Sequence, residues 1–227
     1  EEVISFPTFI TKAYAHLKDF RNRVQPVFLS KESEIILIEL KKDRYNMGGS
    51  AMLEAYDQTG NSVPDIDGES VKAIFSFIQS LIKSEKIISG APKTQGGLFV
   101  TISKLAMAND IGVRIEDIST GIDFFFNEEI GIVLQVNRYD TKDIISQAES
   151  LGLRAILLGS TNISYNKEIS YFENKENKSI SLESLRQYFS TTSNTIKKHL
   201  GINQIVLDNQ SFVKQNYKLT FNPDDKD

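Results

Sequence analysis

The run Glu34–Leu40 restricts the fold more than any other stretch of this chain. It reads Glu-Ile-Ile-Leu-Ile-Glu-Leu, so apolar side chains fall on both of its alternating faces. A strand of this kind is buried on both sides and needs a layer of structure against each. Further apolar, strand-like runs at Gly131–Val136 and Arg154–Gly159 alternate with helical patterns. The chain is therefore predicted to be an α/β protein with helices layered on a mixed sheet.

Two other stretches have the spacing of amphipathic helices, and a third has that of a strand. Glu69–Glu85 carries apolar side chains three and four positions apart, and its phenylalanines are predicted to lie in the core. The stripe consists of Val71, Ile74, Phe75, Ile78, Leu81 and Ile82. Ser181–Leu200 is predicted to be the second helix, ended by Gly201. Ile4–Ala15 alternates β-branched and aromatic residues, which predicts an N-terminal strand.

A polar loop precedes a third helical pattern and ends in Gly96–Gly97. The first N–H groups of a helix lack partners within it, and the helix dipole makes that end positive. Two glycines let an anion approach the backbone closely, and Lys93 and Thr94 add a charge and a hydroxyl. The loop therefore has two interpretations: a phosphate-facing loop, or a close-packing turn, which is the commoner use of two glycines before a helix. The sequence contains neither of the glycine-rich nucleotide fingerprints.

The composition excludes several classes of function. The net charge is −4 and no apolar run could span a bilayer, so neither nucleic acid nor a membrane is expected as a partner. The absence of cysteine excludes disulfides, thiolate metal sites and a cysteine nucleophile in these residues, and it fits a cytoplasmic protein. His16 and His199 lie far apart, which argues against a histidine metal site or a catalytic triad. The sequence begins with Glu, as a piece of a longer protein would.

Two pairs of acidic residues have a structural and a catalytic interpretation. Asp65 and Asp67 lie in a turn-rich segment, which favours a turn and a helix cap over a metal pair. Glu128 and Glu129 are neighbours near a short helix predicted over Gly121–Glu129, and adjacent residues on a helix point apart. We interpret them as surface or capping charges and not as an acid/base pair.

Several strings, taken together and in order, resemble one protein family. They are Met47–Ala51, Ala55–Gly60, Pro64–Asp67, Gln95–Thr101, Ala106–Ala108 and Phe126–Val136. The set is similar to the last PurM-like C-terminal lobe of phosphoribosylformylglycinamidine synthase in its long, single-chain form. The helix Leu185–Ser193 is similar to the segment that leads toward the glutaminase domain of that enzyme. The resemblance implies a three-layer α/β/α lobe, related to aminoimidazole ribonucleotide (AIR) synthase.

The same resemblance implies a division of the chain into three parts. Residues 1–40 would be trailing strands and a junction from a preceding PurM N-terminal-like lobe. Residues 41–175 would form the α/β lobe itself, and residues 176–227 would form a helical connector and tail. The implied partners are the other lobes and the glutaminase domain of the same parent chain.

The implied parent activity is that of an ATP-dependent glutamine amidotransferase, a C–N ligase of de novo purine biosynthesis. It converts formylglycinamide ribonucleotide to formylglycinamidine ribonucleotide. This lobe would form one wall of a site for ATP or ADP and would supply no catalytic residue. The isolated chain is accordingly predicted to be inactive.

The nucleotide loop of the family usually runs His-Asp-x-Ser-Asp-Gly-Gly-Leu, which aligns with residues 91–98 here. The resemblance implies nucleotide-binding residues at Lys93, Thr94, Gly96 and Gly97. Pro92 stands where the family has a metal-binding Asp and cannot ligate a cation, so the magnesium of the parent enzyme is not expected at this loop. Two alternatives remain open: a non-catalytic scaffold or docking domain of PurM-like ancestry, and a lobe of aminoimidazole ribonucleotide or selenophosphate synthetase.

Overall fold

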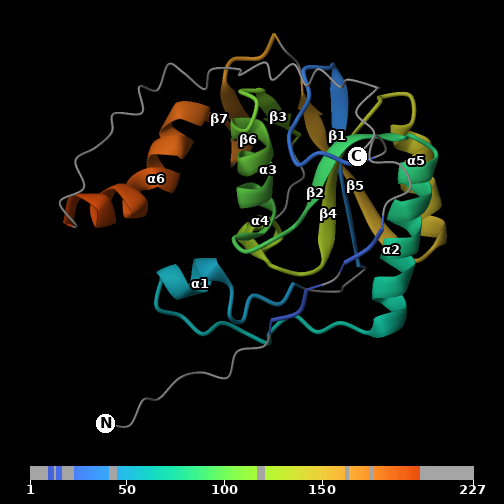
Figure 1. Cartoon of the computed structure of the whole chain (residues 1–227), viewed down its shortest axis with the longest axis horizontal. Helices are drawn as coiled ribbons and strands as arrows, with labels where there is room; N and C mark the ends of the chain where they lie inside the picture. Colours follow the sequence, from blue (N-terminus) through green and yellow to red (C-terminus); the bar gives the residue numbers. More distant parts are fainter. Residues whose placement is uncertain are drawn as a thin grey trace, which may run out of the picture. The chain divides into compact units, whose positions relative to one another are not determined.

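The structure is a computed structural model that describes residues 10–12, 14–16, 23–40, 45–116, 121–161, 164–173 and 176–199. The chain divides into two compact units, residues 1–185 and 186–227. The sheet and the helices that cover it belong to the first unit (Figure 1). No helix in the described part of the chain has the length and apolarity needed to cross a membrane.

One mixed sheet of seven strands forms the centre of the first unit, in the order β2-β4-β1-β5-β3-β6-β7. The strands are β1 (Ser33–Leu40), β2 (Ile87–Pro92), β3 (Val113–Ile115), β4 (Gly131–Val136), β5 (Leu153–Thr161), β6 (Glu168–Glu173) and β7 (Glu176–Ser181). Neighbouring strands are antiparallel except β3 and β6, which run parallel. β1 therefore has an antiparallel neighbour on each edge, and the mixed sheet predicted from the sequence is confirmed.

Helices cover both faces of this sheet. The described residues form the helices α1 (Ala51–Ala55), α2 (Gly68–Lys83), α3 (Gly97–Met107), α4 (Ile122–Phe126), α5 (Thr141–Ser150) and α6 (Leu182–His199), the last of which continues into the second unit. Ile35 and Leu37 of β1 point into a core shared with α3 and α4, whereas Ile36 and Ile38 point into a core shared with α2 and α5. Figure 1 shows α3 and α4 on one side of the strands and α2 with α5 on the other. The α/β/α layering is confirmed, and it follows from the apolar residues on both faces of β1.

Side-chain caps fix the starts of the first two helices. Ser50 is the N-cap of α1, and its hydroxyl accepts a hydrogen bond from the Leu53 N–H. Asp67 is the N-cap of α2, and its Oδ1 accepts one from the Ser70 N–H at 2.9 Å. Asp67 is thus a helix cap, as predicted. Among the described residues no cluster of three or more histidine, cysteine, aspartate or glutamate side chains could hold a metal ion.

The prediction for the phenylalanines of α2 is half wrong. Phe77 is 4% exposed and lies in the core, but Phe75 is 63% exposed. The buried stripe centres on Ile74, Ile78 and Leu81, and Phe75 lies about 100° around the helix from Ile74. Phe75 was included in the predicted stripe because it is apolar, but its position around the helix lies outside the buried face.

Some predictions at the ends of the chain lie outside the described residues. Of the strand predicted over Ile4–Ala15, residues 10–12, 14 and 15 are described and form no strand, so the prediction is wrong for them. Ile10 and Tyr14 are 77% and 88% exposed, so their apolar side chains have no sheet to pack on. Residues 1–9 and 13, and the predicted helix end at Gly201, are not among the described residues. The three-part division of the chain stays a prediction.

The two phenylalanines of α2 provide a matched test of the packing. We expect Phe77→Ala to lower the free energy of unfolding by about 3–5 kcal/mol, because it leaves a cavity in the core. Phe75→Ala should change it by less than about 0.5 kcal/mol, because the side chain is mostly in solvent. Urea denaturation of the two variants measures both values. Equal losses in the two variants would contradict the assignment of the buried face.

Candidate functional site

The two glycines at the start of α3 are required by close packing. Gly96 and Gly97 have φ of 89° and 73°, in the left-handed region that favours glycine. A Cβ on Gly97 would lie 2.8 Å from backbone atoms of residues 125–127, and one on Gly96 would lie 2.6 Å from the Val100 side chain. The Gly97 N–H donates to the Thr94 carbonyl at 2.8 Å. The glycines therefore let α3 approach the end of α4, which is the packing interpretation of this motif.

A carboxylate of the protein itself lies at this end of α3. Glu128 Oε1 accepts a hydrogen bond from the Gly96 N–H at 2.8 Å and a second from the Ala51 N–H at 2.9 Å. A negative charge is favoured at a helix N-terminus. Glu128 is a capping charge, as predicted. Glu129 is not at the surface, since it is only 3% exposed, and its Oε1 accepts a hydrogen bond from the Asn46 N–H at 3.3 Å.

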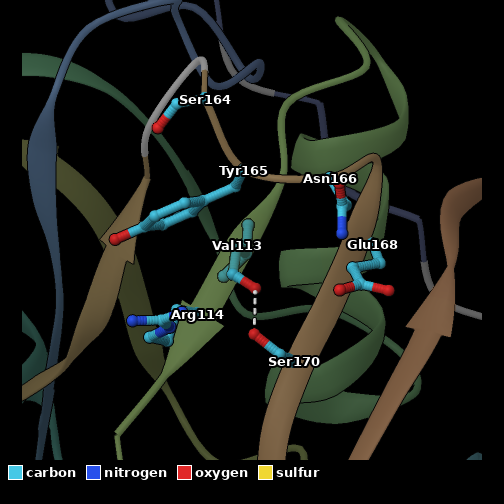
Figure 2. Close-up of a pocket in the computed structure, with 7 residues that line it drawn as sticks. All are labelled: Val113, Arg114, Ser164, Tyr165, Asn166, Glu168 and Ser170. Atoms are coloured by element: carbon cyan, nitrogen blue, oxygen red, sulfur yellow. Dashed lines mark hydrogen bonds between the residues drawn. The ribbon is translucent and has the colours of Figure 1, made fainter.

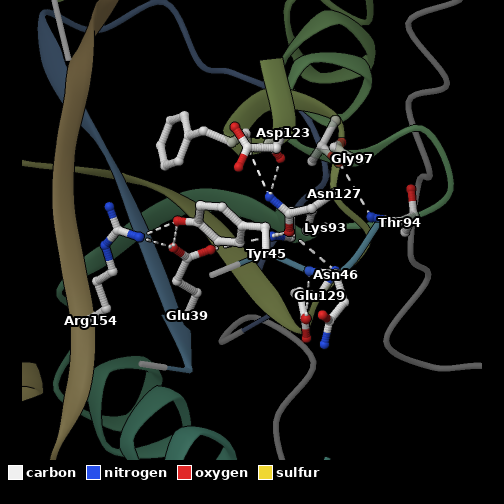
Figure 3. A network of polar contacts seen from close by, with 12 residues as sticks. Glu39, Tyr45, Asn46, Lys93, Thr94, Gly97, Asp123, Asn127, Glu129 and Arg154 are labelled. Carbon is white, nitrogen blue, oxygen red and sulfur yellow. Dashed lines mark hydrogen bonds and ion pairs between the residues drawn. The ribbon is translucent and has the colours of Figure 1, made fainter. Parts of the chain in front are cut away.

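The ammonium group of Lys93 points into the protein and away from solvent (Figure 3). Its side chain is fully buried, and it donates to Glu39 Oε2 at 3.2 Å and to Asn127 Oδ1 at 2.6 Å. Burial lowers the pKa of Lys93, and the nearby carboxylates of Glu39 and Glu129 oppose that shift. An ammonium paired in this way does not face a ligand outside the loop.

Tyr45 and Arg154 complete a polar network around Glu39. The Tyr45 hydroxyl donates to Glu39 Oε1 at 2.6 Å, and Arg154 Nη1 lies 3.4 Å from the same oxygen and contacts the Tyr45 hydroxyl. The Lys93 ammonium lies 5.8 Å from the centre of the Tyr45 ring. Burial, followed by the hydrogen bond to Glu39, raises the pKa of Tyr45 far above its usual range. With Glu129 included, two carboxylates face two cations, so the network is neutral.

The four residues predicted to bind a nucleotide differ in their exposure to solvent. Lys93 lies inside the network, and Gly96 and Gly97 are buried. Thr94 is exposed, with its N–H 3.4 Å from Thr101 Oγ1, and Pro92 is exposed at the end of β2. Their assignment as nucleotide-binding residues stays a prediction. The network of Glu39, Tyr45, Asn127 and Arg154 was not predicted. Its only signal in the sequence is the charge of Glu39 inside an otherwise apolar run.

Two polar pockets lie elsewhere on the first unit, and neither is lined by the predicted loop. The smaller, of about 170 Å³, lies beside the parallel pairing of β3 and β6 (Figure 2). There the Arg114 guanidinium lies 5.2 Å from the centre of the Tyr165 ring, and the Ser170 hydroxyl donates to the Val113 carbonyl at 3.3 Å. The larger, of about 350 Å³, is lined by residues that include Glu34 and Arg138, themselves an ion pair at 3.5 Å.

Similarity to solved structures identifies the fold. No family model matches the sequence. PurL from Thermotoga maritima complexed with FGAR matches with a TM-score of 0.59 at 11% identity, over 73% of this chain and 30% of PurL. The same protein complexed with ATP gives 0.57 at 11% identity, over 73% and 27%. E. coli HypE, a hydrogenase maturation protein, gives 0.50 at 17% identity, over 70% of this chain and 52% of HypE.

These matches confirm the PurM-like fold that the sequence motifs implied, and with it the structural resemblance to a lobe of PurL. The chain spans less than a third of the length of the PurL structures that it matches. The fold is therefore similar to that of one lobe of PurL.

Removing one partner of the buried Glu39–Lys93 pair is expected to destabilise the protein more than removing both charges. Lys93→Met leaves the buried Glu39 carboxylate with weaker compensation, and we expect a loss of about 3 kcal/mol in the free energy of unfolding. Adding Glu39→Gln should recover at least half of that loss, because it removes the uncompensated charge. Urea denaturation of the two single variants and the double variant measures the coupling. A double variant no more stable than Lys93→Met would contradict it.

The raised pKa of Tyr45 predicts a loss of stability in alkali. Below the usual tyrosine pKa of 10.0 the phenol is protonated in both folded and unfolded chains. Above it the unfolded chain ionises while the folded chain does not, so stability falls as the pH rises. The difference in unfolding free energy between wild type and Tyr45→Phe should shrink by about 1 kcal/mol between about pH 10 and pH 11. A constant difference over that interval would show that Tyr45 ionises in the folded protein.

Proposed function

We propose that this chain is a structural lobe of a PurL-type synthetase, the enzyme that converts formylglycinamide ribonucleotide to formylglycinamidine ribonucleotide with ATP and glutamine. The observation that carries the structural role is the buried, neutral network of Glu39, Lys93 and Asn127. It includes Lys93, which the resemblance implied to be a nucleotide-binding residue. A charged residue enclosed in this way contributes to the lobe itself and not to chemistry on a substrate.

Two independent observations support the PurL-type parent. The motifs from Met47 to Val136 follow the order of the last PurM-like lobe in the long form of that enzyme. The fold matches T. maritima PurL, which has been solved with FGAR and with ATP. On this proposal the partners of the lobe are the other lobes and the glutaminase domain of a cytoplasmic parent chain. The isolated chain turns over no ATP.

A second candidate function is one wall of a nucleotide site, formed by Thr94, Gly96 and Gly97. It is favoured by the exposed Thr94 side chain at the start of α3 and by the complexes of PurL with ATP and ADP. Lys93 would contribute to such a site only through the position of the loop. Pro92 offers no ligand to a cation, so this wall would hold no magnesium of its own.

Thr94 separates the two candidates. In the full-length parent protein, the structural role predicts that Thr94→Ala leaves kcat/KM for ATP within about twofold of wild type. The nucleotide-wall role predicts that Thr94→Ala raises KM for ATP at least about tenfold, as expected for a lost hydrogen bond to a charged phosphate, and that Thr94→Ser retains the wild-type value.

The parent activity has its own test. Full-length protein, supplied with FGAR, ATP and either glutamine or ammonia, should form formylglycinamidine ribonucleotide and ADP. The 227-residue chain under the same conditions should release no ADP above background. An inactive full-length protein would overturn the PurL-type assignment, and ATP hydrolysis by the clean 227-residue chain would overturn the structural role.

A further inference from the structure

A loop between β1 and α2, residues 45–62, is closed by its own hydrogen bonds. The Gly48 N–H donates to the Ser62 carbonyl at 3.0 Å, and the Met47 N–H donates to Asn61 Oδ1 at 2.7 Å. The short helix α1 lies within this loop, and none of its five residues is buried. A loop whose ends are joined in this way is compact and is held together by its own contacts.

The contacts of the 45–62 loop with the rest of the lobe include hydrogen bonds to three carboxylates. These are Glu39, which accepts from the Tyr45 hydroxyl, Glu129, which accepts from the Asn46 N–H, and Glu128, which accepts from the Ala51 N–H. Glu128 differs from the other two because the same oxygen also accepts from the Gly96 N–H. One carboxylate oxygen therefore joins the start of α1 to the start of α3.

This double contact is electrostatically favourable, and it occupies a donor that an external anion would need. A carboxylate is favoured at the N-terminus of a helix, and here it lies at the start of two helices at once. While Glu128 accepts from Gly96, that N–H is not free for another anion. The closed loop and an external anion at Gly96 therefore compete for the same donor.

The closed position also leaves one polar atom unsatisfied. Glu129 is 3% exposed, and its Oε2 has no hydrogen-bond partner within the described part of the chain. A buried carboxylate oxygen without a donor is unfavourable compared with a hydrated one. Release of the Asn46 side of the loop would admit water to this oxygen. This unfavourable term offsets part of the gain from the Glu128 contacts and brings the closed and open positions nearer in free energy.

We propose that Glu128 is an autoinhibitory latch, which holds the 45–62 loop closed and occupies the Gly96 N–H at the start of α3. A phosphate-bearing ligand reaches that N–H only when the latch opens. The statement about the ligand rests on the nucleotide-wall candidate described above. The latch itself does not, because it depends only on contacts within the lobe.

Amide hydrogen exchange, followed by NMR on the 227-residue chain, tests the latch. Glu128→Ala should raise the exchange rates of the Ala51 and Gly96 amides at least about tenfold, as expected for the loss of hydrogen bonds to a charged acceptor. Glu128→Gln should give a smaller rise, because it keeps an acceptor but not the charge. Glu54→Gln, which removes an exposed charge from α1, is the matched control and should change neither rate.

A second variant opens the latch from the loop side and leaves Glu128 in place. Ala51 is the first residue of α1, where proline is favoured, and Ser50 has the extended backbone that proline requires before it. Ala51→Pro removes the N–H that Glu128 accepts from, so the amides of residues 46–56 should exchange faster while Gly96 stays protected. If neither Glu128→Ala nor Ala51→Pro raises exchange in the loop, the latch is overturned. A rise spread evenly over β1 and α2 would overturn it as well, since that pattern reports general unfolding.

An ADP titration of the full-length parent protein, which completes the site, then separates the latch from the nucleotide site. If both proposals hold, Glu128→Ala binds ADP at least about fivefold more tightly than wild type, because the competing carboxylate is gone. If exchange in the loop rises but no variant binds ADP, the latch stands and the nucleotide-wall candidate fails. If exchange is unchanged and ADP binds equally to wild type and Glu128→Ala, the nucleotide site stands and the latch fails.

Discussion

The structure of the first unit depends on a single strand that is enclosed in every direction. β1 has an antiparallel neighbour on each edge and a helical layer on each face. Its apolar residues therefore contribute to both cores at once. A polar network lies at each end: Gln135 joins Ser33 and Thr161 near the start of β1, and Glu39 joins Lys93 near its end. Each buried polar group needs a specific partner. These networks therefore help to fix the register of β1 against its neighbouring strands, which apolar contacts alone specify less sharply.

Much of this architecture follows from sequence patterns that act over short distances. The apolar faces of Glu34–Leu40 predicted the central strand and the two layers, and Asp67 was predicted to be a helix cap. Local patterns fail where a side chain lies near the border of a stripe, as Phe75 does. They also fail for Ile10 and Tyr14, whose alternation suits a strand that has no partner among the described residues.

The candidate site was less predictable because its contacts are distant in sequence. The partners of Lys93 are 54 and 34 residues away, and those of Glu128 are 77 and 32 residues away. A glycine pair before a helix has the same local appearance whether an external anion or an internal carboxylate lies in front of it. The sequence could identify the start of α3 as a place for a negative charge. It could not show that the chain supplies that charge itself.

The order of the strands has a consequence for synthesis of the chain. The two strands that flank β1 begin at Gly131 and Leu153, about a hundred residues further along. During translation both hydrogen-bonding edges of β1 stay unpaired until those segments leave the ribosome. An apolar strand exposed for that long is a template for wrong pairing with another nascent chain. β1 is therefore most exposed to wrong pairing in the interval before β4 and β5 are synthesised.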